Sequence, residues 1–147
     1  MKRQSGVTLI ELLIVVVIVA ILGGIAVPAY TDHILRGKIA QVTENLAEAK
    51  VRMEQVFNSN RTYATSPGGT SCPDFSTLFD KTGFTLKMSD CPGDAGTTFT
   101  LTATGSSSSG TGGFMYSINQ NGEKKSTTPA TSEVQSCWLM SKTASSC

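Results

Sequence analysis

The chain has 147 residues, which is enough for one ordinary domain with an added segment. Its formal net charge is +1 and charged residues make up 16% of the sequence, which argues against a polybasic nucleic-acid binder and against a disordered acidic tail. Aromatic residues are few, at 7%, and Ser and Thr are plentiful after residue 60, so we expect a small core partly built from loops.

An apolar segment, residues 7–27, follows a short basic stretch at the N-terminus. About 20 apolar residues at 1.5 Å each span the hydrocarbon core of a bilayer. Lys2 and Arg3 precede the segment, so the positive-inside rule predicts a cytoplasmic N-terminus and places the rest of the chain outside the cytoplasm. The segment contains one carboxylate, Glu11, and an ionised carboxylate in lipid is costly unless it has a partner or a function.

Three explanations compete for this segment. It is a cleaved secretory signal, a plain membrane anchor, or a retained helix that is cut before its apolar run, between Gly6 and Val7. The first two leave Glu11 without a purpose. In the third, Glu11 of one chain can neutralise the new Val7 amine of a neighbouring chain. A buried charge pair adds little net stability but penalises wrong registers, so Glu11 would set the axial offset between packed chains.

The sequence KRQSGVTLIELLIVVVIVAILGGIAVPAY, residues 2–30, resembles the leader and N-terminal helix of type IV pilins. The matching features are the short basic leader, Gly6 before the cleaved bond, Glu11 at the fifth mature position, and Pro28. The resemblance implies that a prepilin peptidase cuts after Gly6 and methylates the amine of Val7. One departure is that Val7 stands where the family usually has Phe.

The resemblance is to type IVa, PilE-like pilins, and the ending CWLMSKTASSC looks like their disulfide-closed C-terminal region. It implies a subunit held in the bacterial inner membrane and then polymerised into an extracellular pilus that serves adhesion, twitching motility or DNA uptake. It also implies three segments: a leader at 1–6, a transmembrane and filament-core helix at 7–29, and a periplasmic or extracellular globular domain at 30–147.

The implied partners are other pilin subunits, the prepilin peptidase, the inner-membrane assembly platform with its ATPase, and membrane lipid before assembly. No cofactor, metal or enzymatic activity is expected. The single histidine, His33, has no nucleophile nearby in the sequence, and the aspartates lack the spacing of a calcium loop.

A weak point is predicted in the apolar helix at 23–28. Pro28 lacks an N–H group and clashes with the carbonyl of Gly24, and Gly23 and Gly24 lower the helix propensity further. We therefore expect a kink or a melted stretch here. The functional interpretation is melting within a filament that makes the fibre extensible, and the alternative is an ordinary helix bend without a function.

Beyond Pro28 the pattern is that of an amphipathic helix ending within residues 57–63. Apolar side chains recur at steps of three and four. We expect this stripe to pack on the chain's own sheet rather than in a free coiled coil. The stripe consists of Leu35, Ile39, Val42, Leu46, Ala49, Met53 and Val56.

Three later segments, 84–88, 99–101 and 114–118, alternate apolar and polar residues, which is typical of half-buried strands. A Gly- and Ser-rich stretch at 105–113 predicts a flexible hairpin loop, and Asn121-Gly122 predicts a tight turn into EKKSTTP. The sequence thus predicts an α+β fold in which one long N-terminal helix, with a membrane half and an amphipathic half, packs on a small antiparallel sheet that is mostly a meander. This agrees with the pilin fold.

The four cysteines all lie in the second half and suggest two disulfides in an oxidising compartment. Three pairings are open, and proximity in sequence favours Cys72–Cys91 and Cys137–Cys147. A metal site is the alternative, but the sequence has no CxxC pair and His33 is distant from the cysteines.

Three other functions remain open. A type II secretion pseudopilin shares the leader and helix, although the Cys137–Cys147 ending argues against it, and a plain membrane-anchored domain would keep its leader. A minor pilin that captures DNA needs a concentrated basic stripe, whereas loss of Lys2 and Arg3 lowers the side-chain charge from +1 to −1. The lysines available for DNA contacts are Lys81, Lys87, Lys124, Lys125 and Lys142.

Overall fold

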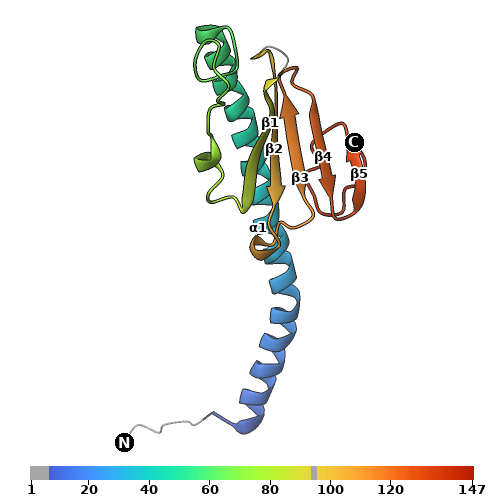
Figure 1. The fold of residues 1–147 in the computed structure, drawn as a ribbon. Helices are drawn as coiled ribbons and strands as arrows, with labels where there is room; N and C mark the ends of the chain where they lie inside the picture. Colours follow the sequence, from blue (N-terminus) through green and yellow to red (C-terminus); the bar gives the residue numbers. More distant parts are fainter. Residues whose placement is uncertain (1–6, 94–95) are drawn as a thin grey trace, which may run out of the picture. The chain divides into compact units, whose positions relative to one another are not determined.

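A computed structural model of the chain describes residues 7–93 and 96–147 (Figure 1). The chain divides into two compact units between Ile34 and Leu35. One helix, α1 (Leu9–Asn60), runs through both units, and the second unit also holds a five-stranded antiparallel sheet. These elements confirm the predicted α+β fold with a long N-terminal helix.

The C-terminal half of α1 buries the predicted apolar stripe. Ile39, Val42, Leu46, Ala49 and Met53 are all 0% exposed and belong to the core of the second unit. The two ends of the stripe are only partly buried. Because a stripe with 3.6-residue periodicity lies on one side of a helix, these residues attach α1 to a single face of the sheet.

The sheet has the strand order β1-β2-β3-β4-β5, and every neighbouring pair is antiparallel. This confirms the predicted meander. The strands are β1 (Phe84–Gly93), β2 (Thr98–Gly105), β3 (Met115–Asn119), β4 (Lys124–Thr128) and β5 (Thr131–Gln135). Strand β5 is an addition to the expected elements. Its three central residues are all exposed, so it lacks the apolar alternation that identifies a half-buried strand.

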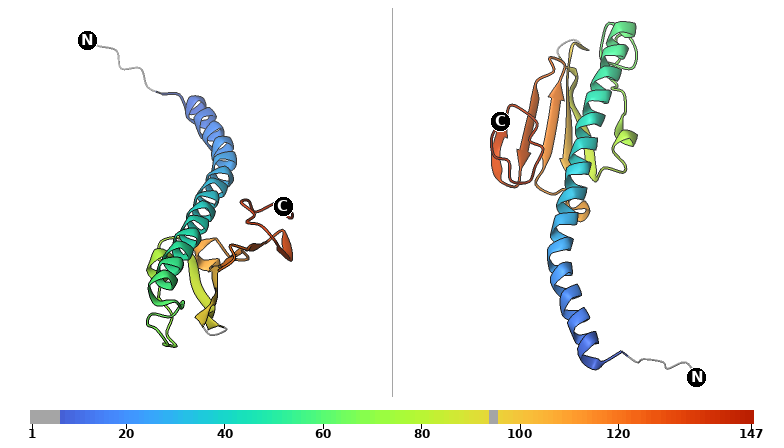
Figure 2. Two further views of the ribbon diagram at one scale, coloured as in Figure 1. Left: turned by 90° about the horizontal axis from the view of Figure 1, so that it is seen from above. Right: turned by 180° about the vertical axis from the view of Figure 1, so that it is seen from behind.

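Side chains alternate between the two faces of the sheet. Phe99, Leu101 and Ala103 of β2 are fully buried against α1, and the threonines between them point to the opposite face. Tyr116 and Ile118 of β3 join the same core. The second unit therefore has two layers, with α1 against one face of the sheet and the other face open (Figure 2).

The loop at 105–113 is held by hydrogen bonds to neighbouring elements, although its composition suggested a flexible link. The buried hydroxyl of Thr111 donates to the Gly83 carbonyl at 2.6 Å, and the Lys38 ammonium of α1 donates to the Ser109 carbonyl at 2.7 Å. Gly105 permits this packing, because a Cβ there would lie 1.9 Å from the Thr111 carbonyl oxygen. The loop thus connects α1 with the start of β1.

Candidate functional site

The start of α1 is defined by a side-chain cap. The Thr8 hydroxyl accepts a hydrogen bond from the backbone N–H of Glu11 at 3.3 Å, and the Thr8 carbonyl accepts from Leu12 N–H at 3.2 Å. This is the threonine half of a Thr-x-x-Glu capping box, which satisfies N–H groups that otherwise lack a partner. Thr8 is not among the residues predicted from the sequence, although the motif is readable from its spacing alone.

The predicted processing site lies partly outside the described residues. Gly6 is not among them, and Val7 is described and is 75% exposed. Glu11 is exposed in the first turn of α1, so its carboxylate can meet a group from another chain.

The first half of α1 exposes its apolar side chains on every side. Exposure runs from 75% at Val7 to 65% at Val27, and the large residues between them are all at least half exposed. By length and composition, this part of α1 is apolar enough to cross a membrane. A helix that is apolar all round requires lipid or other chains to cover it.

The expected weak point does not interrupt α1 in the single chain. The helix is continuous through Gly23, Gly24 and Pro28, so the expected melted stretch is absent here. Close to this point, the Thr31 hydroxyl donates to the Pro28 carbonyl at 2.9 Å. A Cβ added at Gly23 or Gly24 would meet no atom within 4 Å, so these glycines are not required for packing within the chain.

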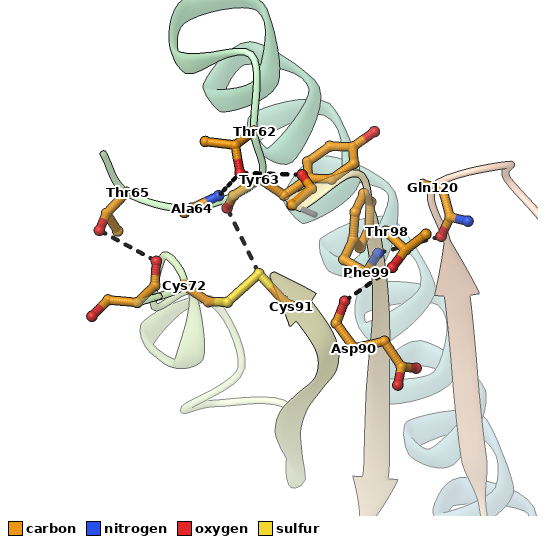
Figure 3. The surroundings of a disulfide bond; sticks show 12 residues. Thr62, Tyr63, Ala64, Thr65, Cys72, Asp90, Cys91, Thr98, Phe99 and Gln120 are labelled. Atoms are coloured by element: carbon orange, nitrogen blue, oxygen red, sulfur yellow. Dashed lines mark hydrogen bonds between the residues drawn. A yellow bond between two sulfur atoms is a disulfide. The ribbon is translucent and has the colours of Figure 1, made fainter. Parts of the chain in front are cut away.

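Both favoured disulfides are present. Cys72–Cys91 and Cys137–Cys147 have Cα–Cα distances of 6.0 and 6.1 Å. Figure 3 shows that the first bridge ties the segment after α1 to the end of β1. The Cys91 sulfur also lies 3.7 Å from the Tyr63 carbonyl oxygen, a van der Waals contact because a disulfide sulfur carries no proton.

The C-terminal segment 136–147 packs on the helix-side face of β4. The Ser126 hydroxyl donates to the Cys137 carbonyl at 2.6 Å and accepts from Leu139 N–H at 3.0 Å. The buried Tyr116 hydroxyl donates to the Leu139 carbonyl at 2.7 Å, and this burial raises the pKa of Tyr116 well above its usual range. The disulfide-closed segment is therefore anchored to the core as well as closed on itself.

Two of the predicted lysines fall on one line across the open face of the sheet. Lys87 of β1 pairs with Thr102 of β2, which pairs with Ser117 of β3, which pairs with Lys125 of β4. Paired residues in an antiparallel sheet project to the same side. We call Lys87, Thr102, Ser117 and Lys125 the lysine row. Its outer members are exposed, and three strand spacings of about 4.8 Å separate them by about 14 Å.

The other three predicted lysines are not in this row. Lys124 precedes Lys125, so it projects to the opposite face, where its ammonium lies 4.6 Å from the centroid of the Trp138 ring. Lys81 is exposed in the turn before β1, and Lys142 is exposed inside the Cys137–Cys147 segment. The five lysines therefore do not form a single stripe on the sheet.

Among residues 7–93 and 96–147, no group of three or more His, Cys, Asp or Glu side chains is placed to hold a metal ion. His33 is exposed on α1. The Asp74 carboxylate accepts the Ser76 backbone N–H at 2.8 Å, and this bond lowers the pKa of Asp74. That contact forms a turn just before a short 3-10 helix, Ser76–Leu78, and serves the local fold.

Comparison with known families gives two matches. Residues 1–27 match the prokaryotic N-terminal methylation motif. Residues 28–114, more than half of the chain, match a family described as type IV minor pilin ComP, DNA uptake sequence receptor. The chain belongs to this family of type IV minor pilins. The sequence-based resemblance to type IV pilins is thereby confirmed.

Individual relatives match this pilin over part of its length. The chain is 43% identical over 57 residues to fimbrial protein EcpB of Eikenella corrodens, which covers 39% of the chain and 36% of the relative. It is 40% identical over 62 residues to a type IV major alpha-pilin of Moraxella bovis, covering 42% and 39%. A probable minor fimbrial protein of Dichelobacter nodosus is 37% identical over the same length, again covering 42% and 39%.

These matches span about two fifths of each relative's length. No solved structure matches the chain significantly.

Proposed function

We propose that this pilin is a minor subunit of a type IV pilus that enters the filament through the first half of α1 and binds duplex DNA on the open face of its sheet. The family's description as a DNA uptake sequence receptor supports the DNA-binding part of the proposal. The structural observation that supports DNA binding is the lysine row.

The assembly part of the proposal follows from the exposed apolar helix. In it, residues 1–6 are a leader removed by a prepilin peptidase between Gly6 and Val7, and the Val7 amine is methylated. Residues 7–29 first span the inner membrane, with a cytoplasmic N-terminus, and then form the filament core. Residues 30–147 form the outer domain, on the periplasmic side and later on the pilus. The inner-membrane platform and other pilins are the partners.

Glu11 sets the register in this proposal. Its hydrogen bond to Thr8 is made by the backbone N–H, and its exposed carboxylate can pair with a neighbouring Val7 amine. In a dry filament core, a subunit offset by one helical turn would leave both charges without partners, which is costly. Melting around Gly23, Gly24 and Pro28 remains part of the proposal only for the packed filament, because α1 is continuous in the single chain.

The lysine row suits the phosphate backbone of duplex DNA. Lys87 and Lys125 are separated by about 14 Å along the row, and the major groove is about 12 Å wide, so the two ammonium groups can reach phosphates on both of its sides. Thr102 and Ser117, between them, have small side chains, and Ser117 is buried. Contacts of this kind release counterions, so binding must weaken as salt increases.

The test uses the full chain in detergent micelles and a fluorescent duplex, with the dissociation constant measured between 50 and 200 mM salt. In the Lys87→Gln/Lys125→Gln double variant, loss of two phosphate contacts should lower the slope of log K against log salt by about 1.8. The matched comparison is Lys124→Gln/Lys142→Gln, which removes the same charge from positions outside the row and should leave the slope unchanged.

Equal losses in both double variants would indicate diffuse charge attraction and would contradict the lysine row. Absence of salt-sensitive binding by the unmodified chain would remove the DNA-binding function and leave only the assembly role.

A further inference from the structure

An open pocket of about 420 Å³ lies where the segment after α1 meets the β1–β2 connection. Three glycines and a proline line much of it, and Arg61 is the charged residue among its lining side chains. The remaining lining residues are Asn60 and Thr62.

The walls of this pocket are fixed by backbone contacts. Gly96 has a φ of +84°, and a Cβ there would lie 2.0 Å from the Thr62 hydroxyl oxygen, so the two segments touch closely. The Gly96 carbonyl accepts Tyr63 N–H at 2.8 Å and the Thr62 hydroxyl at 3.2 Å. The Cys72–Cys91 bridge joins the same two segments a few residues away (Figure 3). A pocket held in this way needs little ordering when a ligand binds.

Arg61 occupies a position that glycine would fill with less strain. It follows the last residue of α1, its N–H bonds to the Phe57 carbonyl at 2.8 Å, and its φ is 57°. Helices commonly end with a left-handed residue here, and that residue is usually Gly, or sometimes Asn, because a Cβ is strained in this conformation. A residue kept in such a conformation suggests that its side chain has a function.

The guanidinium of Arg61 is exposed, and no hydrogen bond or ion pair joins it to another residue in the described parts of the chain. Its rigid fork of donors suits a phosphate, which it can contact through two parallel hydrogen bonds. We infer that the Arg61 pocket binds a backbone phosphate of the DNA that the lysine row contacts. This inference rests on the proposed function and extends the contact surface to a second place in the fold.

The strand register gives the separation between the Arg61 pocket and the lysine row. Thr102, the partner of Lys87, is four residues from Thr98, which pairs with Gly93 at the end of the β1–β2 ladder beside the pocket. At about 3.3 Å per residue, the pocket lies roughly 13 Å along β2 from the row. A duplex of about ten base pairs is near 34 Å long, which exceeds this separation.

The test compares Arg61→Gly with the unmodified chain in the DNA titration described above. Glycine removes the cation and also relieves the left-handed backbone, so the melting temperature should stay equal or rise while DNA binding weakens. The slope of log K against log salt should fall by about 0.9, so the affinity gained between 200 and 50 mM salt should shrink about 3.5-fold. Arg61→Lys, which keeps the charge, should retain the slope.

Arg52→Ala is the matched control, because Arg52 is exposed on α1, is paired with Glu48, and lies outside both proposed contacts. It should leave the slope unchanged. If Arg61→Gly keeps the unmodified slope, or if Arg52→Ala loses as much, the pocket assignment is overturned while DNA binding by the row stands. If the unmodified chain shows no salt-sensitive binding, the proposed function fails as well.

Discussion

The two halves of α1 differ in what covers them. In the half before Leu35, the large apolar side chains are exposed on all sides, whereas in the second half the stripe is fully buried from Ile39 to Met53 and most of the remaining surface is polar. The second half has a sheet, a core and two disulfides of its own. The two halves of one continuous helix therefore differ in how they are stabilised. The second half packs on its own chain, and the first half requires lipid or other chains to cover it.

The largest expected effect comes from the charge in the uncovered half. Glu11→Gln should leave the protein in the membrane and lower its incorporation into filaments about 100-fold or more. Removing one partner of a buried charge pair costs about 3–5 kcal/mol, and 1.4 kcal/mol is a factor of ten. The measurement is the ratio of this pilin in sheared filaments to that in membranes, by quantitative immunoblot.

Glu44→Gln is the matched control, since Glu44 is exposed in the covered half of the same helix. It should incorporate normally. Normal incorporation of Glu11→Gln would contradict the proposed role of the charge pair.

Truncating one leucine in each half tests whether the two halves of α1 are energetically separate. Leu46→Ala should lower the free energy of unfolding of the second unit by about 2–5 kcal/mol, because Leu46 is 0% exposed in its core. Leu13→Ala, at a position 54% exposed in the first half, should leave that unfolding unchanged. Thermal unfolding followed by circular dichroism in detergent measures both. Similar losses in the two variants would mean that the halves are not energetically separate.

The disulfides act only on the covered half. Loss of either bridge, by Cys72→Ser/Cys91→Ser or by Cys137→Ser/Cys147→Ser, should lower the free energy of unfolding by about 3 kcal/mol from the loop-closure entropy alone. Cleavage of the leader should proceed at the normal rate in both variants. The melting temperature and the extent of cleavage are the two measurements, and an unchanged melting temperature would contradict a stabilising role.

The smallest expected effect is on the pH dependence of stability. Burial raises the pKa of Tyr116 above the value of about 10 in the unfolded chain. Its neutral hydroxyl therefore contributes stability that is complete below pH 10 and is lost as pH rises through the folded-state pKa. At pH 11 the loss should be about 1 kcal/mol relative to pH 9.

Tyr116→Phe should abolish this part of the alkaline loss, at the cost of about 1 kcal/mol at all pH values for the missing bond to the Leu139 carbonyl. Tyr30→Phe, at a position 66% exposed, should change neither quantity. The measurement is the melting temperature of the unmodified chain and of both variants between pH 8 and 11. A variant with the same alkaline decline as the unmodified chain would contradict the assignment to Tyr116.

Much of the fold is readable from the sequence because its signals are periodic or local. The apolar run and the stripe from Ile39 to Met53 identify the two halves of α1, and short loops between cysteines favour the pairing that is observed. Strand β5 escapes detection because an edge strand with exposed central residues has no alternating pattern. The capping role of Thr8 was not predicted, although the Thr-x-x-Glu spacing that indicates it is local and visible in the sequence.

The candidate DNA surface is not readable from the sequence in the same way. Lys87 and Lys125 align only because three successive strand registers place them on one line, and a one-residue slip in any register would move them apart. The Arg61 pocket depends on the left-handed φ of Arg61 and on the approach of Gly96, a contact between segments far apart in sequence. Both features come from tertiary packing.

We propose that this chain is cut, retained through its uncovered helix and built into a filament. The most direct measurement is the intact mass of the chain recovered from sheared surface filaments. We expect a mass that starts at Val7, with one added methyl group and four hydrogens fewer for the two disulfides. A chain that is absent from filaments and still carries residues 1–6 in the membrane would contradict it.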